Sequence, residues 1–123
     1  MICLGAGAAV ILALSGPDFT LDWSHSVTRD RWWERWRADA AGLAPVEARI
    51  AGPGAGIDLP PDAVLRDGVW HFTPHLPPRP EVTLAASGAT GGAWRICARG
   101  ECHALPEDRG PIRLWQAADC DQG

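Results

Sequence analysis

Apolar and polar residues alternate along most of this chain, and the alternation predicts short β-strands rather than helices. No segment has a sustained 3.6-residue period, and no internal repeat is present. The segments that alternate are 19–27, 32–36, 43–50, 69–73, 81–87, 94–98, 101–105 and 112–114. Glycine and proline mark the turns between them, and Asp67-Gly68 is a strong tight-turn signal. Seven to nine short antiparallel strands at roughly ten-residue spacing predict an all-β domain, either a small β-sandwich or a partly open barrel.

The stretch 23–36, WSHSVTRDRWWERW, contains four of the seven tryptophans and predicts an antiparallel hairpin. With a tight turn at 28–31, His25 lies directly opposite Glu34, and Trp23 lies opposite Trp36. An imidazole and a carboxylate would then meet on an otherwise apolar face lined by indoles. Such a buried pair is either a structural polar contact or part of a site.

The composition offers His25 and Glu34 few side chains with which they could form a catalytic site. All eleven basic residues are arginine, which excludes a Schiff-base or P-loop lysine. The flanking serines point away from His25 in a regular strand, and His71 and His75 do not share a helical face that would favour a metal site. We therefore interpret His25 and Glu34 as a polar contact in a β-core and expect no enzyme, metal or cofactor. An acid–base enzyme that uses both residues is the less favoured alternative. The net charge of −4 argues against a nucleic-acid partner.

Tryptophans and glycines are the other candidate ligand-binding residues. Trp23, Trp36 and Trp70 can line a ligand cavity, although in a domain of this size we expect the tryptophans to form the core itself. Gly54 and Gly56 belong to the run Gly-Pro-Gly-Ala-Gly, whose backbone amides can cradle an anion. A tight corner between strands is the favoured explanation of that run.

Cys97 and Cys102 flank a predicted two-residue hairpin loop, Arg99-Gly100. They would form a non-hydrogen-bonded pair, in which opposing Cα atoms lie about 4.5 Å apart. That separation is within reach of a disulfide, which would need an oxidising compartment; two reduced thiols are the alternative. Cys120 has no obvious partner, and Cys3 is lost if the N-terminus is removed. The tail from Gln116 is polar, and we expect it to fray.

The first fourteen residues, MICLGAGAAVILAL, carry no charged side chain and are too short to span a bilayer comfortably. Their length fits the apolar part of a secretory signal, and Ala13-Leu14-Ser15 is a small-x-small sequence that a peptidase can cut. A weak signal peptide, an uncleaved anchor and a gene start assigned too late all remain open, and a buried first strand is the further alternative. We favour an export segment or short anchor at 1–15 followed by one β-domain at 16–123. The protein would then be periplasmic or exported, with membrane contact only through that segment.

Several motifs occur along the chain in an order that resembles one known family. They are Ser24-His25-Ser26-Val27, Trp33-Glu34-Arg35-Trp36, Gly52-Pro53-Gly54-Ala55-Gly56, Asp67-Gly68-Val69-Trp70 and Trp94-Arg95-Ile96-Cys97 with Gly100-Glu101-Cys102. The ordered set resembles the domain-of-unknown-function family 1850 (DUF1850) from about Phe19 to Leu114. Thr28 stands where the family has an acidic residue, and Ile57 stands where it tends to have methionine.

The resemblance implies a small exported β-protein with no established activity. It also implies genes beside tripartite, periplasmic-binding-protein-dependent (TRAP) transporters of the TAXI type. The leading hypothesis is therefore a non-enzymatic accessory or interaction module whose partner is a TRAP transporter component or its solute-binding protein. The alternative from a different class is a small-ligand-binding β-barrel with a tryptophan-lined interior.

Overall fold

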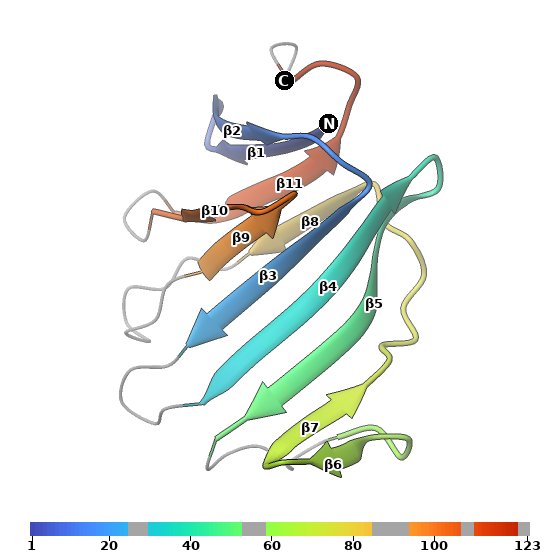
Figure 1. The fold of residues 1–123 in the computed structure, drawn as a ribbon. Helices are drawn as coiled ribbons and strands as arrows, with labels where there is room; N and C mark the ends of the chain where they lie inside the picture. Colours follow the sequence, from blue (N-terminus) through green and yellow to red (C-terminus); the bar gives the residue numbers. More distant parts are fainter. Residues whose placement is uncertain (25–29, 53–58, 85–93, 107–109, 121–123) are drawn as a thin grey trace.

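The computed structural model describes residues 1–24, 30–52, 59–84, 94–106 and 110–120, and these form two antiparallel β-sheets (Figure 1). The smaller sheet has the strand order β2-β1-β11-β8, and the larger has the order β10-β9-β3-β4-β5-β7-β6. The strands are β1 (Ile2–Ala6), β2 (Ala9–Leu14), β3 (Asp18–Ser24), β4 (Arg31–Asp39), β5 (Gly42–Ala51), β6 (Val64–Arg66), β7 (Val69–Phe72), β8 (Glu81–Leu84), β9 (Trp94–Ala98), β10 (Glu101–Ala104) and β11 (Ile112–Gln116).

The all-β prediction is confirmed in its sandwich form, because the two sheets do not close into a barrel. The described residues contain eleven strands rather than the seven to nine expected. The additional strands are β1, β2 and β6, none of which has the apolar–polar alternation that marks the others. No helix in the described ranges is long and apolar enough to cross a membrane.

The core lies between the two sheets at the end where the smaller sheet covers the larger one (Figure 1). Strand alternation places alternate residues there: in β8, Val82 and Leu84 are buried while Glu81 and Thr83 are exposed. The side chains buried most completely in this core are Ile2, Leu4, Ile112 and Leu114 from the smaller sheet and Phe19, Leu21, Leu43 and Ile96 from the larger one.

The N-terminal segment forms β1 and β2 and belongs to the smaller sheet. Strand β1 lies between β2 and β11, and all five of its residues are buried. Ile2 and Leu4 face the core, whereas Gly5 lies against the Trp115 ring on the opposite face. A strand buried on both faces is apolar throughout, which explains its lack of alternation. In the structure this segment packs as two strands of the smaller sheet, as the buried-strand alternative expects. The domain boundary at residue 16 and a role of the segment in export stay predictions.

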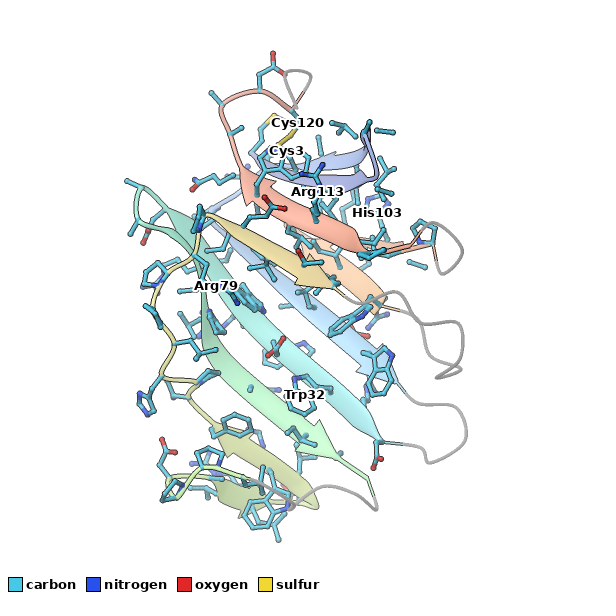
Figure 2. The ribbon with its side chains drawn as sticks, turned by 180° about the vertical axis from the view of Figure 1, so that it is seen from behind. Cys3, Trp32, Arg79, His103, Arg113 and Cys120 are labelled. Atoms are coloured by element: carbon cyan, nitrogen blue, oxygen red, sulfur yellow. A yellow bond between two sulfur atoms is a disulfide. The ribbon has the colours of Figure 1, made fainter. Side chains whose placement is uncertain are left out.

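Two disulfides join distant and neighbouring parts of the chain. Cys3 is bonded to Cys120 across 117 residues, with Cα atoms 5.5 Å apart (Figure 2). This pairing was not expected from the sequence, and the prediction of a frayed tail is wrong for the described residues up to 120. The Ala117 N–H donates to the Met1 carbonyl at 3.0 Å, and Cys120 is buried.

The predicted disulfide between Cys97 and Cys102 is confirmed. The two residues lie directly opposite each other in the β9–β10 hairpin, with Cα atoms 4.1 Å apart. Arg99 and Gly100 form the predicted two-residue loop, and both have positive φ angles, of 51° and 80°. Disulfides persist in oxidising surroundings, so this pair and Cys3–Cys120 indicate an oxidising, extracellular compartment.

The connection from β7 to β8 crosses from the larger sheet to the smaller one and is attached to β5 on the way. The Leu43 N–H donates to the Arg79 carbonyl at 2.7 Å, and the Arg79 N–H donates to the Leu43 carbonyl at 2.8 Å. The approach is so close that a Cβ at Gly42 would lie 2.5 Å from the Arg79 carbonyl oxygen. Gly42 also has φ of 122°, so any other residue there would be strained.

Candidate functional site

The predicted hairpin is present as β3 and β4, but its predicted register is wrong by four residues. Glu34 lies opposite Leu21 rather than His25, and Trp23 lies opposite Trp32 rather than Trp36. Strand β3 ends at Ser24 and β4 begins at Arg31, so the connection is longer than the assumed turn. A shift by an even number of residues keeps every side chain on its predicted face.

Three of the candidate site residues, His25, Gly54 and Gly56, lie outside the described residues. The others lie on one face of the larger sheet, which packs against the smaller sheet at one end and extends past it at the other. They are Trp23, Glu34, Trp36 and Trp70.

A row of large apolar side chains crosses this face from one strand to the next. The strand registers place Trp94 opposite Trp23, Trp23 opposite Trp32, Trp32 opposite Ile50, Ile50 opposite Trp70, and Trp70 opposite Leu65. We call these six residues, on β9, β3, β4, β5, β7 and β6, the tryptophan row. The Trp23 and Trp94 rings lie 6.4 Å apart between centroids, within the range of aromatic pairs.

Exposure along β4 shows where the smaller sheet stops covering the larger one. On the inner face of this strand, Trp36 is 6% exposed, Glu34 is half-buried, and Trp32 is 37% exposed. Figure 2 shows Trp32 on that face, beyond the strands of the smaller sheet. At the end of the row, Leu65 is 54% exposed. The tryptophan row therefore starts at the core, against which Trp94 packs, and continues the core face to Trp32 and Leu65, which the described strands of the smaller sheet leave exposed.

Trp36 and Trp70 have different environments although both were candidate ligand-binding residues. Trp36 belongs to the core and stacks on Phe19, with ring centroids 6.1 Å apart and planes inclined by 13°. Trp70 is half-buried in the tryptophan row. Trp36 is thus a core residue, as the interpretation of the tryptophans as core predicts, while Trp70 lies where a binding partner can reach.

Glu34 lies between the buried end of β4 and the tryptophan row. The indole N–H of Trp36 donates to its carboxylate at 3.3 Å. Burial raises the pKa of the Glu34 carboxyl above its ordinary value of 4.5, and hydrogen bonds from the Trp32 and Trp36 side chains partly offset that rise. The carboxyl therefore lies between the exposed indole of Trp32 and the buried indole of Trp36 and accepts a hydrogen bond from the Trp36 indole.

This arrangement offers a surface for binding. Within the described part of the chain, no group of three or more His, Cys, Asp and Glu side chains could hold a metal ion. Glu34 is surrounded by apolar neighbours on the strands beside it, Leu21 and Ala48. Rigid indole rings beside one oriented carboxyl form a surface that can pack against an apolar group and hydrogen-bond to it.

We expect Glu34→Gln to make the protein more stable at pH 7 and to reduce the pH dependence of its stability. A raised folded-state pKa means that the folded chain binds the proton more tightly than the unfolded chain. That contribution to stability is complete below about pH 4.5 and is lost as the pH rises through the raised pKa. Glutamine keeps an acceptor for the Trp36 indole but carries no charge. Thermal unfolding at pH 4 and pH 7 measures the difference.

The control for this prediction is Glu101→Gln, whose side chain is 63% exposed and whose carboxylate pairs with the His103 imidazole at 2.9 Å, so its loss should bring no gain in stability. The gain in melting temperature from Glu34→Gln should be larger at pH 7 than at pH 4, and larger than any gain from the control. An equal shift at both pH values would show that the Glu34 carboxyl is not held in an unfavourable environment.

The structure thus defines a class of protein: a two-sheet antiparallel β-domain with two disulfides and an aromatic face that extends past its core. Residues 19–105 match the family described as "Domain of unknown function (DUF1850)", and the chain belongs to that family. No curated protein and no solved structure matches the chain. The matched range contains the whole tryptophan row and the Cys97–Cys102 hairpin, whereas Cys3 and Cys120 lie outside it.

Sequence reasoning missed four members of the tryptophan row as site residues: Trp32, Ile50, Leu65 and Trp94. Trp32 was placed on the correct face by alternation, but the predicted register paired Trp23 with Trp36 instead of with Trp32. Leu65 lies in a three-residue strand that is too short for its alternation to be read. The signal that could have found it is the Asp67-Gly68 turn, which pairs Leu65 with Trp70 in a two-residue hairpin.

Proposed function

We propose that this protein is an exported, non-enzymatic binding module that serves as an accessory protein of a TRAP-type (TAXI) solute transport system. The observation that carries the proposal is the tryptophan row, which leaves Trp32 and Leu65 exposed on a face otherwise continuous with the core. The partner is a component of the transporter or its solute-binding protein, and it docks on this row.

The row has the properties of a protein-binding surface. Trp32 and Leu65 are among the large hydrophobic side chains most exposed to solvent in the described residues. Buried Ile50 and half-buried Trp70 lie between these two side chains and connect them into one apolar row, and contiguous apolar surface of this kind marks interaction sites. Tryptophan is enriched among residues whose truncation costs about 2 kcal/mol or more of binding energy, because a rigid indole buries a large area with little loss of side-chain entropy.

The proposed partner follows from the compartment and the family. Two disulfides indicate an oxidising, extracellular compartment, in which solute-binding proteins and the outer surfaces of membrane transporters are accessible. The chain belongs to DUF1850, and the resemblance to this family is the reason for choosing a TAXI-type TRAP system. The family resemblance thus supports the choice of a transport partner, and the exposure of the tryptophan row supports the position of the docking surface.

Capture from membranes tests this function with a control on the same strand. Trp32 and Trp33 are adjacent tryptophans whose side chains lie on opposite faces of the larger sheet. We expect the tagged protein and Trp33→Ser to capture a TRAP component from detergent-solubilised membranes of the native host. Trp32→Ser should capture at least about tenfold less of that component. Circular dichroism checks that both variants fold. Capture of no transporter component, or equal capture by Trp32→Ser and Trp33→Ser, would contradict the proposal.

The other candidate functions have less support from the geometry. A ligand-binding barrel needs an enclosed interior, whereas here the sheets do not close and Phe19, Leu21 and Trp36 pack within the interface between them. A small ligand would have to use the open tryptophan row instead. An enzyme based on His25 and Glu34 loses its predicted cross-strand pair, because Glu34 lies opposite Leu21.

A further inference from the structure

The outer face of the larger sheet, opposite the tryptophan row, carries a cleft of about 610 Å³. Its floor is formed by Ala51 on β5 and Val69 on β7, which lie side by side. Arg31 on β4 pairs with Ala51, and Arg66 on β6 pairs with Val69, so the two arginines stand at either end of this floor. Short side chains between long ones create the hollow. We call it the arginine cleft.

The next row of residues along the strands forms one wall of the arginine cleft. Trp33, Arg49 and His71 are paired across β4, β5 and β7, and all three line the cleft. The Arg49 guanidinium lies 4.4 Å from the centroid of the Trp33 ring and donates to the Glu47 carboxylate at 3.0 Å. Stacking and pairing together hold Arg49 in one orientation.

Arg31 and Arg66 differ in ion pairing from most of the other arginines near this face. Arg35, Arg49 and Arg95 each pair with a carboxylate on the larger sheet. None of the ion pairs found in the described residues includes Arg31 or Arg66. The formal net charge of the whole chain is −4. Asp67 is the single carboxylate among the described residues that line the cleft. The cleft therefore concentrates positive charge on an acidic protein.

We propose that the arginine cleft binds a small organic anion that carries two separate carboxylate groups. Three strand spacings separate Arg31 from Arg66, which places their Cα atoms about 14 Å apart. Each flexible side chain can extend inward over Ala51 and Val69, so each guanidinium can take one carboxylate in a bidentate pair. The volume falls within the range of about 300–1,000 Å³ that small-molecule sites occupy. This site lies on the face opposite the tryptophan row and does not depend on the function proposed above.

Titration by NMR with glutarate, acetate and inorganic phosphate tests this inference on the full chain. Glutarate offers two separate carboxylates, whereas acetate and phosphate each offer one anionic group. We expect glutarate to bind saturably and to shift the indole N–H signal of Trp33. Acetate and phosphate should bind at least about tenfold more weakly, because each loses one charge-assisted contact.

Variants of Arg31 and Arg66 test whether the site lies at these two arginines. Arg31→Gln/Arg66→Gln should weaken glutarate binding at least about tenfold, with each single variant giving part of the loss. The control Arg37→Gln/Arg79→Gln removes the same charge from exposed positions outside the cleft and should bind as the unmodified protein does. Equal affinity of the two double variants, equal affinity for phosphate and glutarate, or no saturation with glutarate would each overturn the proposal.

Discussion

A chain that lacks residues 1–15 is expected not to fold, even though that segment was first interpreted as an export signal or anchor. The deletion removes β1 and β2, and β1 is an inner strand of the smaller sheet. Ile2, Leu4 and Leu14 are almost completely buried, and each contributes about 1.5–3 kcal/mol by leaving water. The deletion also removes Cys3. The combined loss is comparable with the total stability of a small domain, about 5–15 kcal/mol.

Dispersion of the NMR spectrum and thermal unfolding of 16–123 beside the full chain measure this effect. We expect the shortened chain to show poor dispersion and no cooperative transition. A cooperative transition close to that of the full chain would show that the N-terminal hairpin is dispensable. The same reasoning predicts that protein isolated from its native compartment has an unbroken chain from β2 to β3, since a cut near residue 15 would leave β1 and β2 attached covalently through Cys3–Cys120 alone.

The second large effect is expected from removing the Cys3–Cys120 disulfide. A cross-link stabilises mainly by restricting the unfolded chain, and the restriction grows with the length of the loop that it closes. The separation of 117 residues predicts a loss of about 4–5 kcal/mol for Cys3→Ala/Cys120→Ala. The separation of 5 residues at Cys97–Cys102 predicts a loss of about 2 kcal/mol by the same relation.

Urea unfolding of the two double variants provides the comparison, with each serving as the control of the other. Alanine leaves no polar group in the place of the buried sulfurs of Cys3 and Cys120, and the same substitution at half-buried Cys97 and exposed Cys102 keeps the comparison matched. The variant that lacks Cys3–Cys120 should unfold at a clearly lower urea concentration than the variant that lacks Cys97–Cys102. The opposite order, or equal losses, would show that the long link is not formed or does not constrain the chain.

The features predicted correctly are those that depend on a few consecutive residues. The Cys97–Cys102 hairpin was placed with its register because Arg99-Gly100 permits a two-residue turn, and such a turn fixes every pair beyond it. The Asp67-Gly68 turn is equally local, and its two residues have φ of 51° and 80°. In these hairpins the sequence contains the whole of the information that sets the register.

The features missed depend on distant parts of the chain. The β3–β4 register could not be found from alternation, because slips by two or four residues all keep Glu34 on the same face. The apolar run of β1 has no period that separates a buried strand from an export signal, and its burial depends on β11 more than one hundred residues later. The bond between Cys3 and Cys120 follows from that same pairing, and no residue pattern near either cysteine predicts it.

A bulge shows how a local irregularity can also defeat alternation. Leu43 and Pro45 are buried, as are Ala48 and Ile50, so the period of two breaks between Pro45 and Ala48. Trp36 pairs with Pro45 and Arg35 pairs with Glu47, which leaves Val46 as the additional residue. The alternation predicted over 43–50 makes no allowance for an additional residue, and Val46 is half-buried at the bulge. The bulge allows Trp36 to stay in the core while Arg35 and Glu47 pair on the outer face at 3.6 Å.

Docking of a partner on the tryptophan row can be detected by site-specific photocrosslinking in the native host. A photoreactive phenylalanine derivative placed at position 32 lies on the row, and one placed at position 33 lies on the opposite face of the same strand. We predict that the probe at 32 crosslinks to a component of a TRAP-type transporter or its solute-binding protein and that the probe at 33 does not. No crosslink to such a component from position 32, or the same crosslinks from both positions, would contradict the account.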